Sequence, residues 1–227
     1  MFETNRDSRA GSKSVETRGR VLEVALRSFR ERGYAATTMR LIASEAGTSL
    51  GNAYYYFPSK SHLVQELYVS VVAEQSRRAT AALRDARGLA DRIAVAWTAA
   101  VDASDEYHAL GAELISEAIR PGAPSSPFSE ESSPAREASQ AVYREVVEGA
   151  RPRVPAVLRE DLPALLWLAQ LGIEIFWVYD SSPDHRRTRT LVNGLAPLVA
   201  SLVGLARLPV ARGLVEDAVA LLHRVRA

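Results

Sequence analysis

TTMRLIASEAGTSLGNAYYYFPSK, residues 37–60, contains the start and stop signals of two short helices. Thr38 is a favourable N-cap for a helix over residues 39–46, because its hydroxyl can accept a hydrogen bond from a free backbone N–H of the first turn. Gly47 ends this helix, since glycine adopts the left-handed conformation that helix C-termini favour.

A second helix is predicted over residues 50–56, directly after the first. Thr48 and Ser49 can provide its N-cap, and Pro58 stops it because proline lacks the N–H and clashes with the preceding turn. The two helices of about two turns each are too small to bury a core alone. They read as a helix-turn-helix that contacts DNA.

The second short helix has two chemically different faces. Ala53 and Phe57 are four residues apart and are expected to point inward. The opposite side is polar and aromatic, and it consists of Gly51, Asn52, Tyr55 and Tyr56. Tyrosine and serine hydroxyls can donate to phosphate oxygens, and an asparagine has the donor and acceptor for a base edge. A surface helix whose tyrosines cover neighbouring helices would show the same residues.

A longer helix precedes the pair. An apolar stripe at helical spacing is formed by Val21, Leu22, Ala25, Leu26 and Phe29. We expect Gly33 to close this helix, which then packs across the two short ones and completes a three-helix domain.

Residues 17–67 resemble the N-terminal DNA-binding domain of the TetR family of bacterial transcriptional regulators. The resemblance lies in Gly33-Tyr34, Thr37-Thr38, Ala43 to Gly47, Gly51-Asn52 and the Tyr54 to Lys60 series, in that order and spacing. It implies a ligand-responsive repressor. The positions predicted to meet DNA are Thr38, Arg40, Thr48, Ser49, Leu50, Gly51, Asn52, Tyr54, Tyr55, Tyr56 and Lys60.

Composition and charge agree with this interpretation. The chain has 227 residues, 47% of them apolar, and no cysteine, which excludes disulfides and thiolate metal sites. The N-terminus is polar and charged, so we expect a cytoplasmic protein without a secretory leader. Residues 1–60 contain 10 Lys or Arg and 6 Asp or Glu, a net +4, whereas the remainder carries 18 and 21, a net −3. The basic excess therefore lies with the predicted DNA-binding part.

The chain is predicted to be all-α, with three parts. Residues 1–15 are a mobile basic tail, 16–60 the helix-turn-helix domain, and 61–227 a larger helical domain for ligand binding and dimerisation. No cofactor is expected.

Several helices are predicted in the larger domain. They span approximately residues 60–83, 89–97, 104–119, 135–149, 162–179, 191–205 and 214–225, with a Pro- and Ser-rich loop over 121–136. Residues 162–179 are apolar on nearly every side. A membrane span is the alternative there, but the segment is shorter than the roughly 20 apolar residues a bilayer needs and contains Glu174. A helix buried in protein, without membrane association, is therefore predicted.

A leucine seam near the C-terminus predicts a partner helix. It comprises Leu191, Leu195, Leu198, Leu202 and Leu205, and Pro197 lies inside it. We infer a homodimer. In the resembled family, two-fold symmetry lets two reading helices reach major-groove faces about 34–36 Å apart, so the expected operator is an inverted repeat in double-stranded DNA.

The middle helices are where the resembled family places a pocket for a small-molecule inducer. The candidate lining is Trp97, Tyr107, His108, Tyr143, Trp167, Gln170, Glu174 and Trp177. The alternative is that the tryptophans are core or dimer contacts and that Glu174 pairs with an arginine.

Two other classes of protein share some of these features. Asp105-x-x-His108 has the spacing of a metal-binding pair in a ferritin-like, all-helical enzyme, but that class needs a second pair and further glutamates. No hydrolase, phosphate-binding or zinc-protease motif is present, so catalysis is not expected. A helical adaptor that binds only protein would leave the tyrosine-rich helix unexplained.

Overall fold

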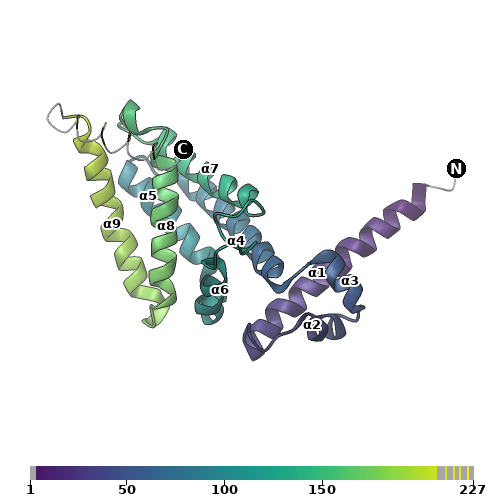
Figure 1. Cartoon of the computed structure of the whole chain (residues 1–227). Coiled ribbons are helices and arrows are strands. Elements are labelled where there is room, and N and C mark those ends of the chain that lie inside the picture. Colours follow the sequence, from purple (N-terminus) through teal and green to yellow (C-terminus); the bar gives the residue numbers. More distant parts are fainter. Residues whose placement is uncertain (1–3, 209–212, 214–216, 218–219, 221–223, 225–227) are drawn as a thin grey trace. The chain divides into compact units, whose positions relative to one another are not determined.

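The computed structural model describes residues 4–208 and positions 213, 217, 220 and 224, with backbone only for 4–12. All regular elements in this described part are helical, which confirms the predicted all-α class. The chain forms two compact units, one of residues 1–69 and 107–132, the other of 70–106 and 133–227. Figure 1 follows the helices along the chain.

The first unit contains the predicted three-helix domain. Its helices are α1 (Thr4–Arg32), α2 (Met39–Glu45) and α3 (Leu50–Tyr56), followed by the first part of α4 (Lys60–Leu83). The stripe predicted on α1 is buried: Val21, Ala25 and Phe29 have no exposed surface. Phe29 packs against Tyr34, with ring centroids 5.1 Å apart. Gly33 follows α1 with φ +82°, a conformation that glycine adopts without strain.

The start of α1 differs from the sequence-based expectation of a mobile tail over residues 1–15. The helix already begins at Thr4 and runs without interruption to Arg32. Residues 4–15 contain only a few strong helix formers, Ala10 and the basic residues, but extending an existing helix is easier than nucleating one. The described part of the basic leader is therefore helical.

The first unit also takes in a segment that the division at residue 60 placed in the larger domain. Residues 104–119 were expected as one helix but form η1 (Asp105–Leu110), a 3-10 helix, and α6 (Gly111–Ala118). Gly111 has a low helix propensity and stands where the two meet. The predicted loop is shorter than expected, because α7 begins at Ser133, and Pro134 is tolerated in a first helical turn.

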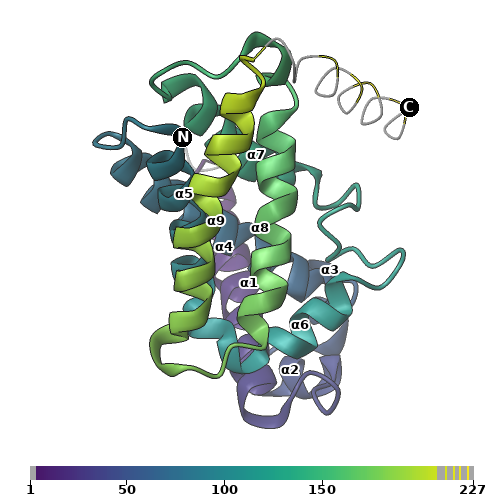
Figure 2. The same ribbon diagram turned by 90° about the vertical axis from the view of Figure 1, so that its left-hand side faces the viewer.

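The second unit is a helical bundle. It contains the rest of α4, α5 (Leu89–Ser104), α7 (Ser133–Gly149), α8 (Leu162–Val178) and α9 (Arg186–Leu205), with the short 3-10 helices η2 (Ala156–Leu158) and η3 (Pro183–His185). Helix α5 packs against α7, α8 and α9, and α8 packs against α7 and α9. Figure 2 shows α8 and α9 side by side. The expected last helix, residues 214–225, lies largely outside the described residues.

A single apolar core holds this bundle together. Trp97 of α5, Tyr143 of α7 and Leu166 of α8 are among its most deeply buried side chains. The Trp97 indole donates to the Leu166 backbone carbonyl over 3.1 Å, so its polar atom is satisfied inside the core. The predicted burial of the 162–179 helix holds for one side of it, whereas Leu168, Ile175, Phe176 and Tyr179 are exposed.

Candidate nucleic-acid interface

The two short helices are capped as the sequence predicts. The Thr38 hydroxyl accepts from the backbone N–H of Leu41 at 3.2 Å, and the Ser49 hydroxyl accepts from that of Asn52 at 3.1 Å. Gly47 lies between the helices with φ +65°. These contacts fix where α2 ends and α3 begins, so the turn has a defined geometry.

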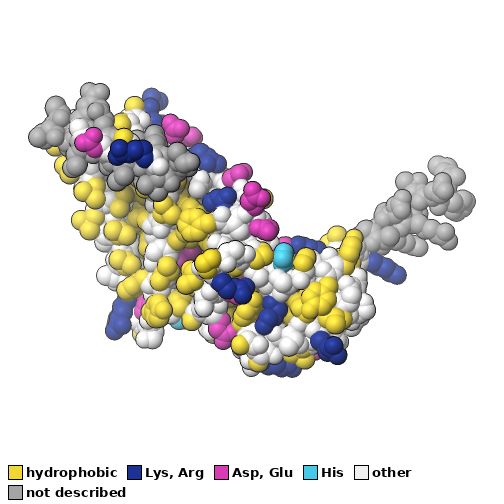
Figure 3. Space-filling view, in the orientation of Figure 1, with side chains coloured by type: hydrophobic (Ala, Val, Ile, Leu, Met, Phe, Trp, Pro, Cys, Tyr) yellow, Lys and Arg dark blue, Asp and Glu magenta, His cyan; other side chains and the backbone are white. Residues whose placement is uncertain are grey.

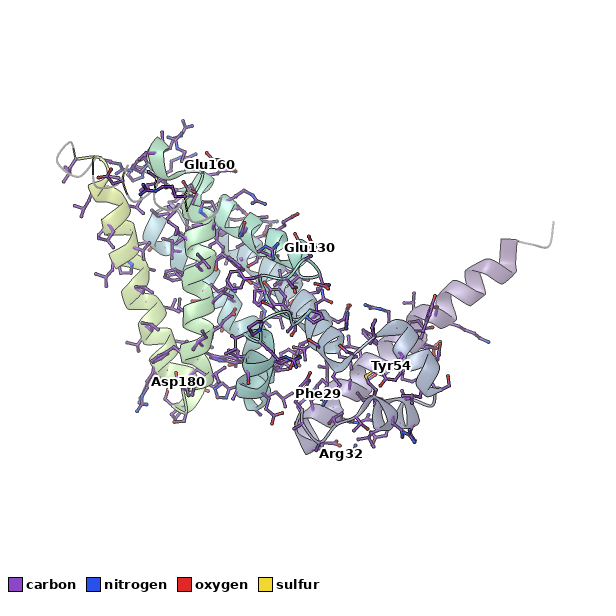
Figure 4. The ribbon with its side chains drawn as sticks, in the orientation of Figure 1. Phe29, Arg32, Tyr54, Glu130, Glu160 and Asp180 are labelled. Carbon is purple, nitrogen blue, oxygen red and sulfur yellow. The ribbon has the colours of Figure 1, made fainter. Side chains whose placement is uncertain are left out.

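Helix α3 has a buried face and an exposed face. Ala53 and Phe57 are buried, which confirms the predicted packing side. Tyr54 and Tyr55 keep 46% and 78% of their surface exposed. Figure 4 labels Tyr54 on this helix. An exposed aromatic pair with hydroxyls can donate to phosphate oxygens.

Asn52 and Tyr56, which are predicted to contact DNA, also have side-chain partners within the protein. Asn52 Nδ2 donates to the Thr48 hydroxyl at 2.7 Å, which holds the amide at the start of α3. The Tyr56 hydroxyl lies 3.1 Å from that of Ser14, so α1 positions this ring. Thr38, Arg40, Ser49 and Gly51 are exposed, whereas Leu50 is partly buried.

Lys60 does not extend freely into solvent. Its ammonium donates to the Tyr34 backbone carbonyl at 2.6 Å and lies 4.3 Å from the centre of the Tyr34 ring. Burial lowers the pKa of Lys60, while the charges of Glu117 and Glu113 act in the opposite direction. Before this lysine can reach a phosphate, it must leave these contacts.

An acidic helix lies against the same part of the first unit. Glu113 of α6 accepts from the backbone N–H of Tyr34, and Glu117 pairs with Arg120. Burial and the charge of Glu117 raise the pKa of Tyr34 to about 12. A groove of about 500 Å³ is lined by parts of residues 34–39, Tyr54, residues 58–61, Glu117 and Arg120. Sequence reasoning missed this neighbourhood, because α6 is about 80 residues away along the chain and no local pattern links the two.

The candidate ligand residues fall into two groups. Trp97, Tyr143, Trp167, Gln170 and Trp177 are buried in the second unit, with Glu174 partly buried beside them. Tyr107 and His108 belong to the first unit, so the structure does not place them in this group. Glu174 accepts from Gln170 Nε2 at 2.6 Å and forms none of the ion pairs among the described residues, contrary to the alternative of an arginine partner.

Asp105, the first residue of the suggested metal-binding pair, contacts a different histidine. Asp105 Oδ1 lies 3.1 Å from Nε2 of His185, which precedes α9. Within the described part of the chain, no three His, Asp or Glu side chains come together as metal ligands.

The leucine seam of α9 is divided between two environments. Leu191 and Leu195 are partly buried against the core of the second unit, and their place in an interface stays a prediction. Leu198, Leu202 and Leu205 are exposed. Together with Leu168, Ile175, Phe176 and Tyr179 of α8 they form what we call the α8/α9 face, where Figure 3 shows hydrophobic side chains gathered.

Comparisons with known proteins divide the chain in a similar way. Residues 21–67 match the family model described as bacterial regulatory proteins, tetR family, and residues 92–221 match the tetracyclin repressor-like C-terminal domain. The HTH-type transcriptional repressor KstR2 of Mycobacterium tuberculosis is 50% identical over 50 residues, 22% of this chain and 25% of that protein. The HTH-type transcriptional regulator TtgR of Pseudomonas putida is 41% identical over 63 residues, 28% of this chain and 30% of that protein.

These curated relatives are therefore matched over about a quarter to a third of their length. A solved structure gives wider coverage. The TetR transcriptional regulator from Nitrosomonas europaea superposes with a TM-score of 0.61 at 18% identity, covering 81% of this chain and 97% of that one. At this identity the likeness shows a common fold.

Proposed function

Because this chain belongs to the TetR family of bacterial regulatory proteins, we propose that it is a transcriptional repressor, released from DNA by a small-molecule inducer. The observation that carries the proposal is α3, a capped helix with Ala53 and Phe57 buried and Tyr54 and Tyr55 exposed. This arrangement supports α3 as the helix that enters the major groove.

The proposed DNA contacts are of two kinds, contacts to phosphate oxygens and a contact to a base edge. The hydroxyls of Tyr54, Tyr55 and Ser49 suit phosphate oxygens, which orient the protein on the duplex. Asn52 suits a base edge, and its bond to Thr48 restricts its amide to a narrow set of orientations. Arg40, exposed in the first turn of α2, suits a phosphate beside the groove.

The first test is a mobility-shift titration with the DNA upstream of the protein's own gene, at 50 and 200 mM salt. A regulator that neutralises several phosphates should lose at least about tenfold in affinity between the two. An unrelated duplex of equal length is the control. Equal binding to both duplexes, or none to either, would contradict the proposal, and an adaptor or an enzyme would behave in this way.

Two variants separate positioning from reading. Tyr55→Phe removes one hydroxyl and should weaken binding to every duplex by about 1 kcal/mol. Asn52→Ala should reduce discrimination at one base pair by about 1–3 kcal/mol. Thr80→Val also removes one exposed hydroxyl, from α4 in the second unit and away from the α8/α9 face, and should bind DNA like the parent.

The α8/α9 face supports a homodimer, the arrangement that an inverted-repeat operator requires. By length and composition alone, Pro183–Leu205 could also cross a membrane, with mean hydropathy 1.3 and 22% of the window buried. A second copy of the chain fits better, because the exposed leucines occupy one side of α9 and the other side packs on α5 and α8. We expect a cytoplasmic protein, located where its operator is.

A further inference from the structure

A chain of buried polar side chains crosses the second unit. Gln75 of α4 and Gln170 of α8 exchange two amide hydrogen bonds, of 2.7 and 3.3 Å. The Tyr143 hydroxyl of α7 donates to the same Gln170 oxygen. Gln170 Nε2 also donates to Glu174, one turn further along α8. The amides are thus satisfied, and the chain ends at a carboxyl group.

Glu174 lacks the partner that such a carboxylate normally has. Burial raises the pKa of this group, and the bond from Gln170 only partly offsets the effect. No basic side chain of the described residues pairs with it. A carboxylate that is partly withdrawn from water without a cation is unfavourable, so proteins usually pair it or keep it for a ligand.

A second polar group on the neighbouring helix can also still form a hydrogen bond. Ser139 of α7 is fully buried, and its hydroxyl has no hydrogen-bond partner in the described structure. Helices α7 and α8 are consecutive and packed together, and Tyr143 and Gln170 lie at similar distances from the loop that joins them. In an antiparallel pair, one turn back from Tyr143 is opposite one turn forward from Gln170. Ser139 is therefore level with Glu174.

Glu174 shares its side of α8 with aromatic residues. Trp167, Gln170, Glu174 and Trp177 recur at helical spacing along one side of α8, and both tryptophans are buried. Aromatic faces attract cations as well as apolar rings. An anionic ligand would be repelled by the Glu174 carboxylate. A neutral ligand would leave the charge of this carboxylate without a partner.

We propose that Glu174 and Ser139 form the polar end of the inducer site and that the ligand is a lipophilic amine. Its protonated nitrogen donates to the Glu174 carboxylate and to the Ser139 hydroxyl, while its apolar body lies among the tryptophans. This inference rests on the proposed function of the second unit as a ligand-responsive domain. It adds the chemical class of the ligand.

Isothermal titration calorimetry with three probes of one ring system tests this. The probes are 2-naphthylmethylamine, 2-naphthylmethanol and 2-naphthoate, titrated into the full chain at pH 8. We expect the amine to bind at least about tenfold more tightly than the alcohol, and 2-naphthoate more weakly still. Glu174→Gln should remove the preference for the amine, and Ser139→Ala should weaken amine binding. Glu148→Gln, an exposed change on α7, is the matched control.

Equal binding of amine and alcohol, a preference that persists in Glu174→Gln, or no binding of any probe would overturn the assignment. DNA binding provides a separate readout, because Glu174→Gln leaves the helix-turn-helix unchanged. If the amine binds through Glu174 and does not release DNA, the ligand class stands and the proposed induction fails. If no duplex is bound specifically, the regulator proposal fails independently of the calorimetry.

Discussion

Asp180 is a buried carboxylate that joins the end of α8 to the start of α9 (Figure 4). Its Oδ1 accepts from the N–H and hydroxyl of Ser182, at 3.0 and 2.6 Å. Its Oδ2 accepts from the N–H and hydroxyl of Thr188, both at 2.8 Å. Burial opposes ionisation, but these bonds outweigh it and hold the pKa of the carboxyl well below its usual range.

Asp180→Asn should therefore destabilise the protein at neutral pH, by about 2 kcal/mol, because an amide cannot accept at both ends. Since the folded pKa is lowered, the stabilisation by Asp180 is present above pH 4 and is lost as the pH falls below it. Urea denaturation at pH 7 and pH 3 measures this, and the difference from the parent should shrink at pH 3. Asp184→Asn, an exposed neighbour, is the control.

Glu174 gives the opposite pH dependence. Burial raises its pKa from 4.5 to about 7. Its contribution to stability is then complete below pH 4.5 and decreases as the pH rises to 7. Glu174→Gln should equal the parent at pH 4 and exceed it at pH 8, by on the order of 1–3 kcal/mol. Thermal unfolding at both values checks this, and a parent as stable as the variant at pH 8 would contradict it.

Single residues with local roles could be predicted from the sequence. Thr38 and Ser49 cap their helices, and Gly33 and Gly47 take the left-handed conformation, because these roles depend on a few neighbouring residues. The partner of Lys60 could not be predicted. It is the Tyr34 carbonyl, 26 positions away, and only the folded chain brings the two together.

At the level of elements, Arg92 connects three helices. From α5 it donates to the backbone carbonyls of Leu83, the last residue of α4, and of Ala86 in the following turn, and to those of Glu145 and Val146 on α7, over 2.7 to 2.9 Å. These are carbonyls near helix C-termini that lack some partners within their own helix. The guanidinium therefore supplies bonds that none of the three helices could make alone.

Arg92→Met should lower the free energy of unfolding by on the order of 3 kcal/mol, since it removes the donor from four carbonyls, those of Leu83 and Val146 in buried bonds and those of Ala86 and Glu145 in partly buried ones. Chemical denaturation measures the change. Arg84→Met, an exposed substitution nearby, should stay within about 0.5 kcal/mol of the parent. A smaller loss for Arg92→Met than for Arg84→Met would mean that water replaces the arginine.

Helices with strong periodicity or clear breakers were predicted well. Gly88 precedes α5, and Ser59 precedes α4. The predictions failed where the local helix propensity of the residues does not decide the structure, as over residues 4–15 and 104–119. There, extension from a neighbouring helix or a tertiary contact decides the outcome.

For the whole molecule, the α8/α9 face is the surface through which we propose that the chain forms a dimer. A one-sided apolar stripe is what the heptad spacing of α9 predicts. The exposed apolar residues of α8 could not be distinguished from its buried residues by sequence, because that segment is apolar on nearly every side. The exposed Leu168, Ile175 and Phe176 emerge only once the core is assembled.

Leu202→Glu should shift the chain from dimer to monomer. Leu202 keeps 65% of its surface exposed in the single chain, and a carboxylate there would be desolvated in the interface. We expect the dissociation constant of the dimer to rise at least about 100-fold, equivalent to roughly 3 kcal/mol. Sedimentation velocity over a range of concentrations measures it. Ile119→Glu, an equally exposed aliphatic position in the first unit, should leave the dimer intact, and a monomeric parent would refute the interface.

All three tryptophans of the chain, at positions 97, 167 and 177, are buried in the second unit. Their ultraviolet emission is therefore an intrinsic optical reporter of that unit alone. The helix-turn-helix contributes only tyrosine fluorescence. Without any attached dye, a spectrum excited at the red edge follows events in the helical bundle, while the DNA-contacting unit stays spectroscopically silent.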